Sequence, residues 1–189
     1  MKKIALLLLL VFTLSLSGCG EDNKKKELEV DIEYYAKLGQ MTDCEFALGG
    51  DIKKLEDLVQ ESYEKGHSDN EDEPVYVEYE YEDYTGILSG TLSYYYMNDK
   101  KDNGIGCIVS LNGGYGFSKD SVAIDVRDTL AGAGFEAEEK PAEDTETFFL
   151  PSFGDFTCLT YKFGDNTVKF IFENNALCAC TVSGVDWSL

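Results

Sequence analysis

Residues 156–184, FTCLTYKFGDNTVKFIFENNALCACTVSG, contain three runs of apolar and β-branched residues separated by short polar turns. Each run has the length and the aromatic and branched side chains typical of a β-strand. The turns are Gly164-Asp165-Asn166 and Asn174-Asn175, and these residue types tolerate the backbone of tight or left-handed turns. The stretch therefore predicts three consecutive antiparallel strands.

A helix is predicted after residue 50, with a shorter helical segment before it. Asp51 can cap the longer helix and Gly66 can end it. Its apolar residues, which fall on one face at helical spacing, are Ile52, Leu55, Leu58 and Val59. In the shorter segment, residues 29–39, the apolar residues at helical spacing are Ile32, Tyr35, Ala36 and Leu38.

The second half of the chain also begins with a predicted helix. Ser118 or Asp120 is the expected cap, and Gly132 and Gly134 end the segment. Its apolar face consists of Val122, Val126 and Leu130. Residues 136–144 are predicted to form a loop that leads to the strands described above.

Three further strand-like segments lie between the two helices, at residues 75–83, 86–98 and 105–111. Residues 98–104, NDKKDNG, join the last two and have the composition of a hairpin turn. The chain is therefore predicted to be an α+β protein, with helices packed on an antiparallel sheet.

The two halves share one plan of helix, loop and strands at similar spacing. Asp51 to Gly90 is 39 residues and Asp120 to Phe156 is 36. This similarity predicts a tandem repeat, with a first unit over residues 28–112 and a second over residues 113–189.

The second half resembles a known fold. GYGFSKDSVAIDVRDTLAGAGF (residues 114–135) and VKFIFENNALCACTVSGVDW (residues 168–187) are similar to the tandem-repeat β-lactamase-inhibitor-protein fold. They also resemble small outer-membrane-assembly lipoproteins of related architecture. In those families a glycine and a hydroxyl residue open the helix, and an aromatic edge such as Phe172-Glu173-Asn174-Asn175 closes a strand. The resemblance covers residues 113–187 well and residues 42–111 poorly, so it implies a fold and no binding residue.

The chain opens with MKKIALLLLLVFTLSLSGCG, which has the layout of a secretory signal peptide. Lys2 and Lys3 precede an apolar run, residues 4–16, that is short for a membrane span. The end of the run, Leu-Ser-Gly-Cys, is similar to the lipobox of bacterial lipoproteins. That resemblance implies cleavage after residue 18 and a diacylglyceryl group on Cys19. The alternatives are an ordinary signal peptide with a chance cysteine, or a short buried helix.

Residues 19–27 are polar and read as a lipidated tether. Their lysines can lie against anionic headgroups, or the segment can be a plain solvated linker. The predicted location is extracytoplasmic, anchored by lipid to the bacterial cell membrane.

The charge restricts the possible partners. Without Lys2 and Lys3 the chain has 14 basic and 36 acidic residues, a net charge of −22. Nucleic acid and anionic membrane surfaces would repel such a chain. The charge is compatible with a basic partner or bound cations, or with a role in solubility alone.

Residues 74–84, PVYVEYEYEDY, alternate glutamate with tyrosine. On a strand, Val75, Val77, Tyr79 and Tyr81 would share one face, expected to be buried, and Tyr76, Glu78, Glu80 and Glu82 the other, expected to be wet. Glu78 and Glu80 would be about 6.6 Å apart, a spacing found between glycosidase carboxylates. Two carboxylates that are neighbours on one wet strand face cannot lie on either side of a sugar. The preferred interpretation is therefore the wet face of a strand and not a catalytic pair.

Metal and catalytic motifs are scarce. The acidic run at residues 69–73 lacks the calcium-loop pattern, and in residues 99–110 Lys101 and Ser110 stand where acidic ligands belong. His67 is the one histidine, no CxxC pair occurs, and the sequence contains no nucleophile elbow or phosphate-binding loop. We therefore assign no metal, no cofactor and no catalytic residue, and we do not expect an enzyme.

Tyrosine is the unusual component, with twelve residues in all and seven of them in residues 76–96. Tyrosine is common at protein interfaces, but it also covers half-buried sheets. The sequence favours a non-catalytic binding or structural protein of the envelope that recognises a protein, or a glycan, through a tyrosine-rich sheet. The alternative is a carboxylate-based hydrolase of cell-wall glycan. The candidate binding residues are Tyr76, Glu78, Glu80 and Tyr95.

Five cysteines remain when Cys19 is lipidated: Cys44, Cys107, Cys158, Cys178 and Cys180. Cys178 and Cys180 are two residues apart and are predicted to face the same side of a strand without a bond between them. The odd count favours buried apolar thiols over disulfides.

Overall fold

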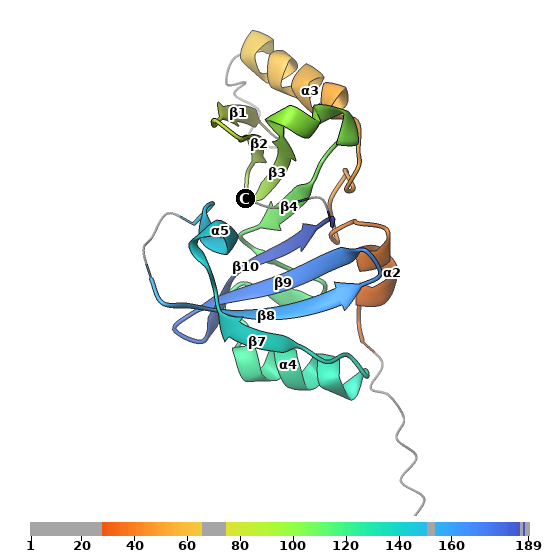
Figure 1. The fold of residues 1–189 in the computed structure, drawn as a ribbon, viewed down its shortest axis with the longest axis vertical. Helices are drawn as coiled ribbons and strands as arrows, with labels where there is room; N and C mark the ends of the chain where they lie inside the picture. Colours follow the sequence, from red (N-terminus) through yellow and green to blue (C-terminus); the bar gives the residue numbers. More distant parts are fainter. Residues whose placement is uncertain (1–27, 66–74, 151–153, 186, 188–189) are drawn as a thin grey trace, which may run out of the picture.

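The computed structural model describes residues 28–65, 75–150, 154–185 and 187. Its main feature is one antiparallel sheet of eight strands in the order β1-β2-β3-β4-β10-β9-β8-β7, with helices beside it (Figure 1). The α+β class predicted from the sequence is confirmed. In that order the strands are Tyr76–Glu80, Tyr84–Ser89, Leu92–Met97, Cys107–Ser110, Ala176–Ser183, Asn166–Glu173, Phe156–Phe163 and Glu138–Pro141.

In each half of the chain a helix precedes four strands of the large sheet, and the tandem repeat stays a prediction. Helix α3 (Ile52–Lys65) precedes β1–β4, and helix α4 (Ala123–Gly132) precedes β7–β10. The last strand of each set, β4 and β10, pair at the centre of the sheet. A single core cluster contains residues of both sets, so the two halves share one sheet and one core.

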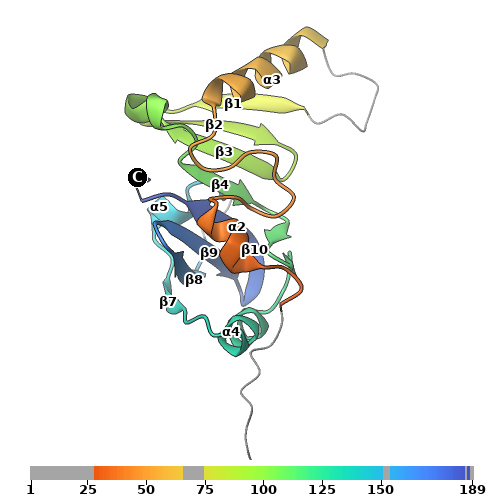
Figure 2. The same cartoon turned by 90° about the vertical axis from the view of Figure 1, so that its right-hand side faces the viewer.

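The sheet has two different faces. On the face we call the helical face, Tyr94, Ile108, Val182 and Phe170 belong to the same core cluster as the buried residues of α2 (Ile32–Lys37), α3 and α4. Figure 2 shows these three helices following one another along the sheet. The opposite face, which we call the aromatic face, carries two smaller clusters that include residues of the segment after α5 (Asp144–Thr147).

The long helix forms as its pattern predicts. The carboxylate of Asp51 accepts a hydrogen bond from Lys53 N at 2.9 Å, which satisfies one of the free N–H groups of the first turn. Ile52, Leu55 and Val59 are buried against the sheet. In α2, Asp31 caps Tyr34 N in the same way, at 3.0 Å.

The three strands predicted in residues 156–184 are β8, β9 and β10. Asn174 and Asn175 have φ of 49° and 68°, and Gly164 has φ of 65°. Both turns thus use the left-handed backbone that these residue types favour.

The first set of strands is divided differently from the prediction. Residues 86–98 do not form one strand, because the chain turns at Gly90 (φ 61°) and produces β2 and β3. The segment between β3 and β4 is a 3₁₀ helix, η1 (Asn98–Asn103), instead of a short hairpin turn.

The predicted loop at residues 136–144 contains a strand and the start of a helix. Residues 138–141 form the edge strand β7, and its charged sequence, EEKP, has no apolar alternation to identify it. The predicted cap of α4 was also wrong, because Val122 is the N-cap and Asp120 has φ of 72°. Ser118 belongs to the short strand β6 (Phe117–Ser118), which pairs with β5 (Gly113–Gly114).

The faces of the first strand differ from those expected, although Glu80 and Glu82 are exposed as predicted and Val77 is half-buried. Tyr76 is 7% exposed and lies on the helical face, whereas Val75, Tyr79 and Tyr81 are 40–49% exposed. The reason is that α3 packs on β1 and its Ser62 hydroxyl accepts a hydrogen bond from Tyr76 N at 3.1 Å. Glu78, Glu80 and Glu82 share a face with Tyr76, so the sequence indicated a wet face there.

The prediction that Cys178 and Cys180 face the same side of the sheet was wrong. A β-bulge between Leu177 and Ala179 shifts the register of β10 against β9. Cys180 belongs to the core of the helical face, and Cys178 packs on the other side with Cys158.

Residues 1–27, including the predicted signal peptide, Cys19 and the tether, lie outside the described residues, as do His67 and the predicted cap Gly66. Within the part of the chain that is described, no helix is both long enough and apolar enough to cross a membrane.

Candidate functional site

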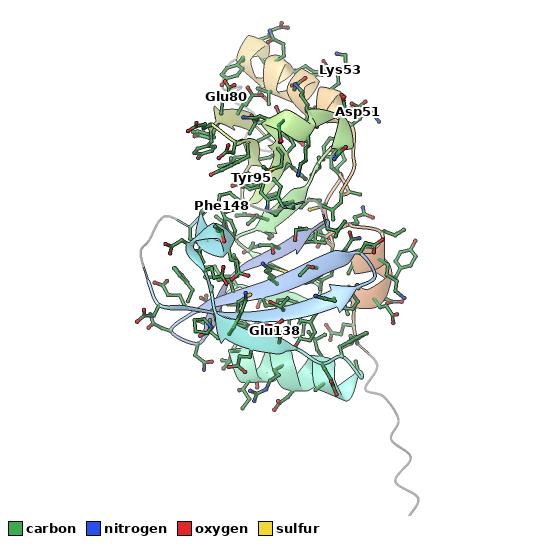
Figure 3. The ribbon with its side chains drawn as sticks, in the orientation of Figure 1. Asp51, Lys53, Glu80, Tyr95, Glu138 and Phe148 are labelled. Atoms are coloured by element: carbon green, nitrogen blue, oxygen red, sulfur yellow. The ribbon has the colours of Figure 1, made fainter. Side chains whose placement is uncertain are left out.

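Aromatic rings gather on the aromatic face near the centre of the sheet. The ring of Tyr84 stacks on Tyr81 at a centroid distance of 4.5 Å and lies 6.2 Å from Trp187. Phe148 packs edge-on against Tyr84 and Tyr95, with centroids 5.0 Å apart in each pair (Figure 3 labels Tyr95 and Phe148). We call these five residues the aromatic cluster. They come from four separate segments, so the cluster forms only in the folded chain.

Two glycines make room for rings of this cluster. A Cβ atom at Gly86 would lie 2.6 Å from Tyr95 Cε1, and one at Gly106 would lie 2.8 Å from Trp187 Cε3. Gly86 lies inside strand β2, and a glycine inside a strand commonly marks such a close approach. The missing side chains therefore let the two rings pack against the backbone of the sheet.

A cavity of about 220 Å³ lies beside the aromatic cluster. Its floor consists of residues of the central strands β4, β10 and β9, which the register places next to one another. Its walls come from the α5 segment and from Trp187. The lining residues are Cys107, Glu143, Thr145, Glu146, Phe148, Phe149, Lys169, Thr181, Ser183 and Trp187.

A charged pair lies at the cavity. Lys169 Nζ donates to Glu146 Oε1 at 2.6 Å, and these side chains are 24% and 8% exposed. Glu146 Oε2 accepts from Glu143 N at 2.9 Å, and Lys140 Nζ lies 3.4 Å from Oε1. Burial opposes the ionisation of Glu146, but the hydrogen bonds from Lys169 and Glu143 and the two lysine charges outweigh it and lower its pKa. Glu146 is therefore an ionised, fully engaged carboxylate.

Two hydroxyl groups on the cavity floor have no hydrogen-bond partner among the described residues. Thr181 is 4% exposed and Ser183 is 9% exposed, and both line the cavity. Buried polar groups are nearly always hydrogen-bonded to protein, water or a ligand. These hydroxyls are available to a molecule that enters the cavity.

The four predicted binding residues do not come together in one site. Tyr76 is buried on the helical face, with half-buried Glu78 and exposed Glu80 on the same side of β1. Tyr95 lies on the aromatic face, where it is 5% exposed and belongs to the aromatic cluster. Of the four, Tyr95 alone lies close to the cavity.

The sequence interpretation missed the residues that line the cavity. Trp187, the single tryptophan of the chain, and Lys169, a charged residue within an otherwise apolar strand, were the signals available in the sequence. The hydroxyls of Thr181 and Ser183 gave no signal, because threonine and serine are ordinary strand residues.

No group of three or more His, Cys, Asp and Glu side chains that could hold a metal ion occurs among the residues that the structure describes. Comparisons of the chain with protein-family models, with curated proteins and with solved structures found no match. The resemblance of residues 113–187 to the β-lactamase-inhibitor-protein fold stays a prediction.

Proposed function

We propose that the protein is a non-catalytic binding protein of the bacterial cell envelope, anchored by a lipid on Cys19. Its binding surface is the aromatic face, from the exposed tyrosines of the β1 end to the cavity floor. The observation that carries this proposal is the aromatic cluster, which borders a cavity with unpartnered hydroxyls on the face opposite α2, α3 and α4.

The exposed tyrosines extend this surface. Tyr79 and Tyr81 are each 49% exposed, and Tyr81 stacks on Tyr84 of the aromatic cluster. Tyrosine offers a large amphipathic contact area at a low cost in conformational entropy. A surface of this kind suits recognition better than catalysis.

The carboxylate-hydrolase alternative has less support. The carboxylates that line the cavity are Glu143 and Glu146, and both belong to the α5 segment. A general acid needs a carboxyl group with a raised pKa, whereas Glu146 has a lowered pKa and both its oxygens are engaged.

The proposal is tested by binding of the purified protein to isolated envelope fractions. The double variant Tyr79→Ser, Tyr81→Ser should lose most of the binding. The matched control is Tyr34→Ser, Tyr63→Ser, which removes two tyrosines that are 58% and 65% exposed on α2 and α3. Equal binding by both double variants and the unmodified protein would contradict the proposed surface.

A further inference from the structure

The cavity beside the aromatic cluster combines features that a single ligand class can satisfy, and we propose that it binds one neutral pyranose residue of a glycan. The inference rests on the proposed function, because it names the ligand of the same face. It depends on the unpartnered hydroxyls, the ring walls, the charged pair and the size of the cavity, each of which is independent of the others.

The floor and the charged pair match the hydroxyl groups of a sugar. Thr181 and Ser183 can each donate and accept, as each sugar hydroxyl can. Lys169 has three N–H donors, and Glu146 is its one hydrogen-bond partner among the described residues, so donors remain for a ligand. An apolar ligand would leave these groups buried and unpaired, which is costly.

The walls match the other surface of a sugar. Phe148, Phe149 and Trp187 line the same cavity, and their rings offer apolar faces. A pyranose presents hydroxyl groups around its edge and C–H groups on its ring faces, so it can hydrogen-bond to the floor while a ring face packs on an aromatic side chain.

The charge excludes anionic sugars. The ammonium group of Lys169 is already balanced by Glu146, and Glu143 at the rim pairs with Lys140 at 3.4 Å, so the cavity offers no unbalanced positive charge to an anionic ligand. The whole chain has a net charge of −20. A uronic acid or a phosphorylated sugar would meet net repulsion, whereas a neutral residue would not.

The size limits the ligand to one residue. The cavity has a volume of about 220 Å³. That is below the volume of sites that enclose a drug-sized ligand, about 300–1,000 Å³. One ring of a longer chain fits, and the neighbouring rings would extend over Tyr84 and Tyr81.

Trp187 provides a direct readout, because it is the only tryptophan of the chain and lines the cavity. The fluorescence of the purified lipoprotein in detergent is followed during titration with cellotetraose, with chitotetraose and with tetragalacturonate. We expect at least one of the two neutral tetramers to produce a saturable change at or below about 10 mM, the range of a weak single-residue site. The anionic tetramer should produce none.

Variants of the two floor hydroxyls test whether the ligand binds in the cavity. Thr181→Val and Ser183→Ala should each weaken binding about 3- to 10-fold, the effect of one hydrogen bond. Neither variant should lower the unfolding midpoint, because neither hydroxyl has a partner to lose among the residues that the structure describes. The control, Thr160→Val, removes a buried hydroxyl from the same face that does not line the cavity, and should leave binding unchanged.

Two results would overturn the inference: no response to either neutral tetramer, or a response that the floor variants leave intact. If neither tetramer binds while the tyrosine double variant still loses envelope binding, the sugar site is wrong and the proposed surface stands, with a protein as its partner. If a tetramer binds at the floor and the tyrosine variant keeps its envelope binding, the proposed surface is wrong and the sugar site stands.

Discussion

The indole ring of Trp187 packs against the backbone of Gly106, so closely that a Cβ atom at residue 106 would lie 2.8 Å from Trp187 Cε3. Gly106→Ala must therefore displace the ring. We expect the tryptophan emission to shift to longer wavelength as the indole becomes more exposed to water. The sugar response proposed above should also weaken, because the ring forms a wall of the cavity.

Gly184→Ala is the matched control for this variant. Gly184 N donates to Gly106 O at 3.0 Å, so the two residues are neighbours, but a Cβ atom at Gly184 would find its nearest atoms at 4.0 Å. Its emission should equal that of the unmodified protein. An unshifted emission in Gly106→Ala would show that the ring does not rest on residue 106.

The last three strands, β8, β9 and β10, and the long helix could be predicted because their patterns are unambiguous. Residues 156–183 form three strand-like runs, and turn residues separate one run from the next. The apolar residues of α3 recur at the helical period and form one stripe. The strand β7 could not be predicted, because an edge strand with one exposed face needs few apolar residues. The faces of β1 were ambiguous because tyrosine suits both a buried and an exposed position.

The cavity is formed by residues that lie far apart in the sequence. Lys169 and Glu146 are 23 residues apart, and Trp187 packs on Gly106, which directly precedes β4 in the other half. The bulge in β10 moves Cys178 to the face opposite Cys180, and no residue type marks that position in advance. Residue types alone therefore indicated an aromatic sheet but not which rings meet.

Tyr161 and Tyr115 provide a matched pair for the cost of a buried hydroxyl group. Tyr161 is 2% exposed and its hydroxyl has no hydrogen-bond partner within the described part of the chain, whereas the hydroxyl of Tyr115, which is 3% exposed, donates to Gln40 O at 3.0 Å. Tyr161→Phe should leave the free energy of unfolding unchanged or raise it by up to about 1 kcal/mol. Tyr115→Phe should lower it by about 1–2 kcal/mol, since it leaves a carbonyl group without its donor. Urea denaturation measures both, and a larger loss for Tyr161→Phe than for Tyr115→Phe would contradict the assignment.

The ion pair at the cavity should make stability depend on pH. Glu146→Gln removes the partner of Lys169 and should lower the free energy of unfolding by about 1–3 kcal/mol at neutral pH. The pKa of Glu146 is lower in the folded chain than in the unfolded chain, so its contribution is full above the unfolded value and is lost as pH falls through the folded value. The difference between the two proteins should therefore shrink below about pH 4.

Glu33→Gln is the control for that measurement. Glu33 pairs with Lys37 at 2.6 Å on the surface, where the lysine and glutamate side chains are 56% and 49% exposed. A pair so exposed should contribute less than about 1 kcal/mol. A Glu146→Gln variant as stable as the unmodified protein at pH 7 would show that the Lys169 pair has no structural role.

Anchoring is expected to depend on Cys19. Two acyl chains on one residue are enough for stable attachment to a membrane, which a net charge of −22 on the mature chain would otherwise oppose. Cys19→Ser should abolish incorporation of labelled fatty acid and release the protein from the membrane fraction. Cys178→Ser is the control and should remain acylated. Label in the Cys19→Ser protein would refute the lipobox interpretation.

The remaining five cysteines are free thiols in the structure, four of them buried and Cys178 half-buried. Burial raises the pKa of Cys44 to about 11 and that of Cys107 to about 12, and it also raises the pKa of Cys178. Alkylation requires the thiolate, so at pH 8 the folded protein should react slowly at Cys178 and not at the other four. After denaturation all five should react, and intact mass would show five added groups on the lipidated chain. A single added group after denaturation would reveal two disulfides. The interpretation of these cysteines as free thiols packed inside the protein would then be wrong.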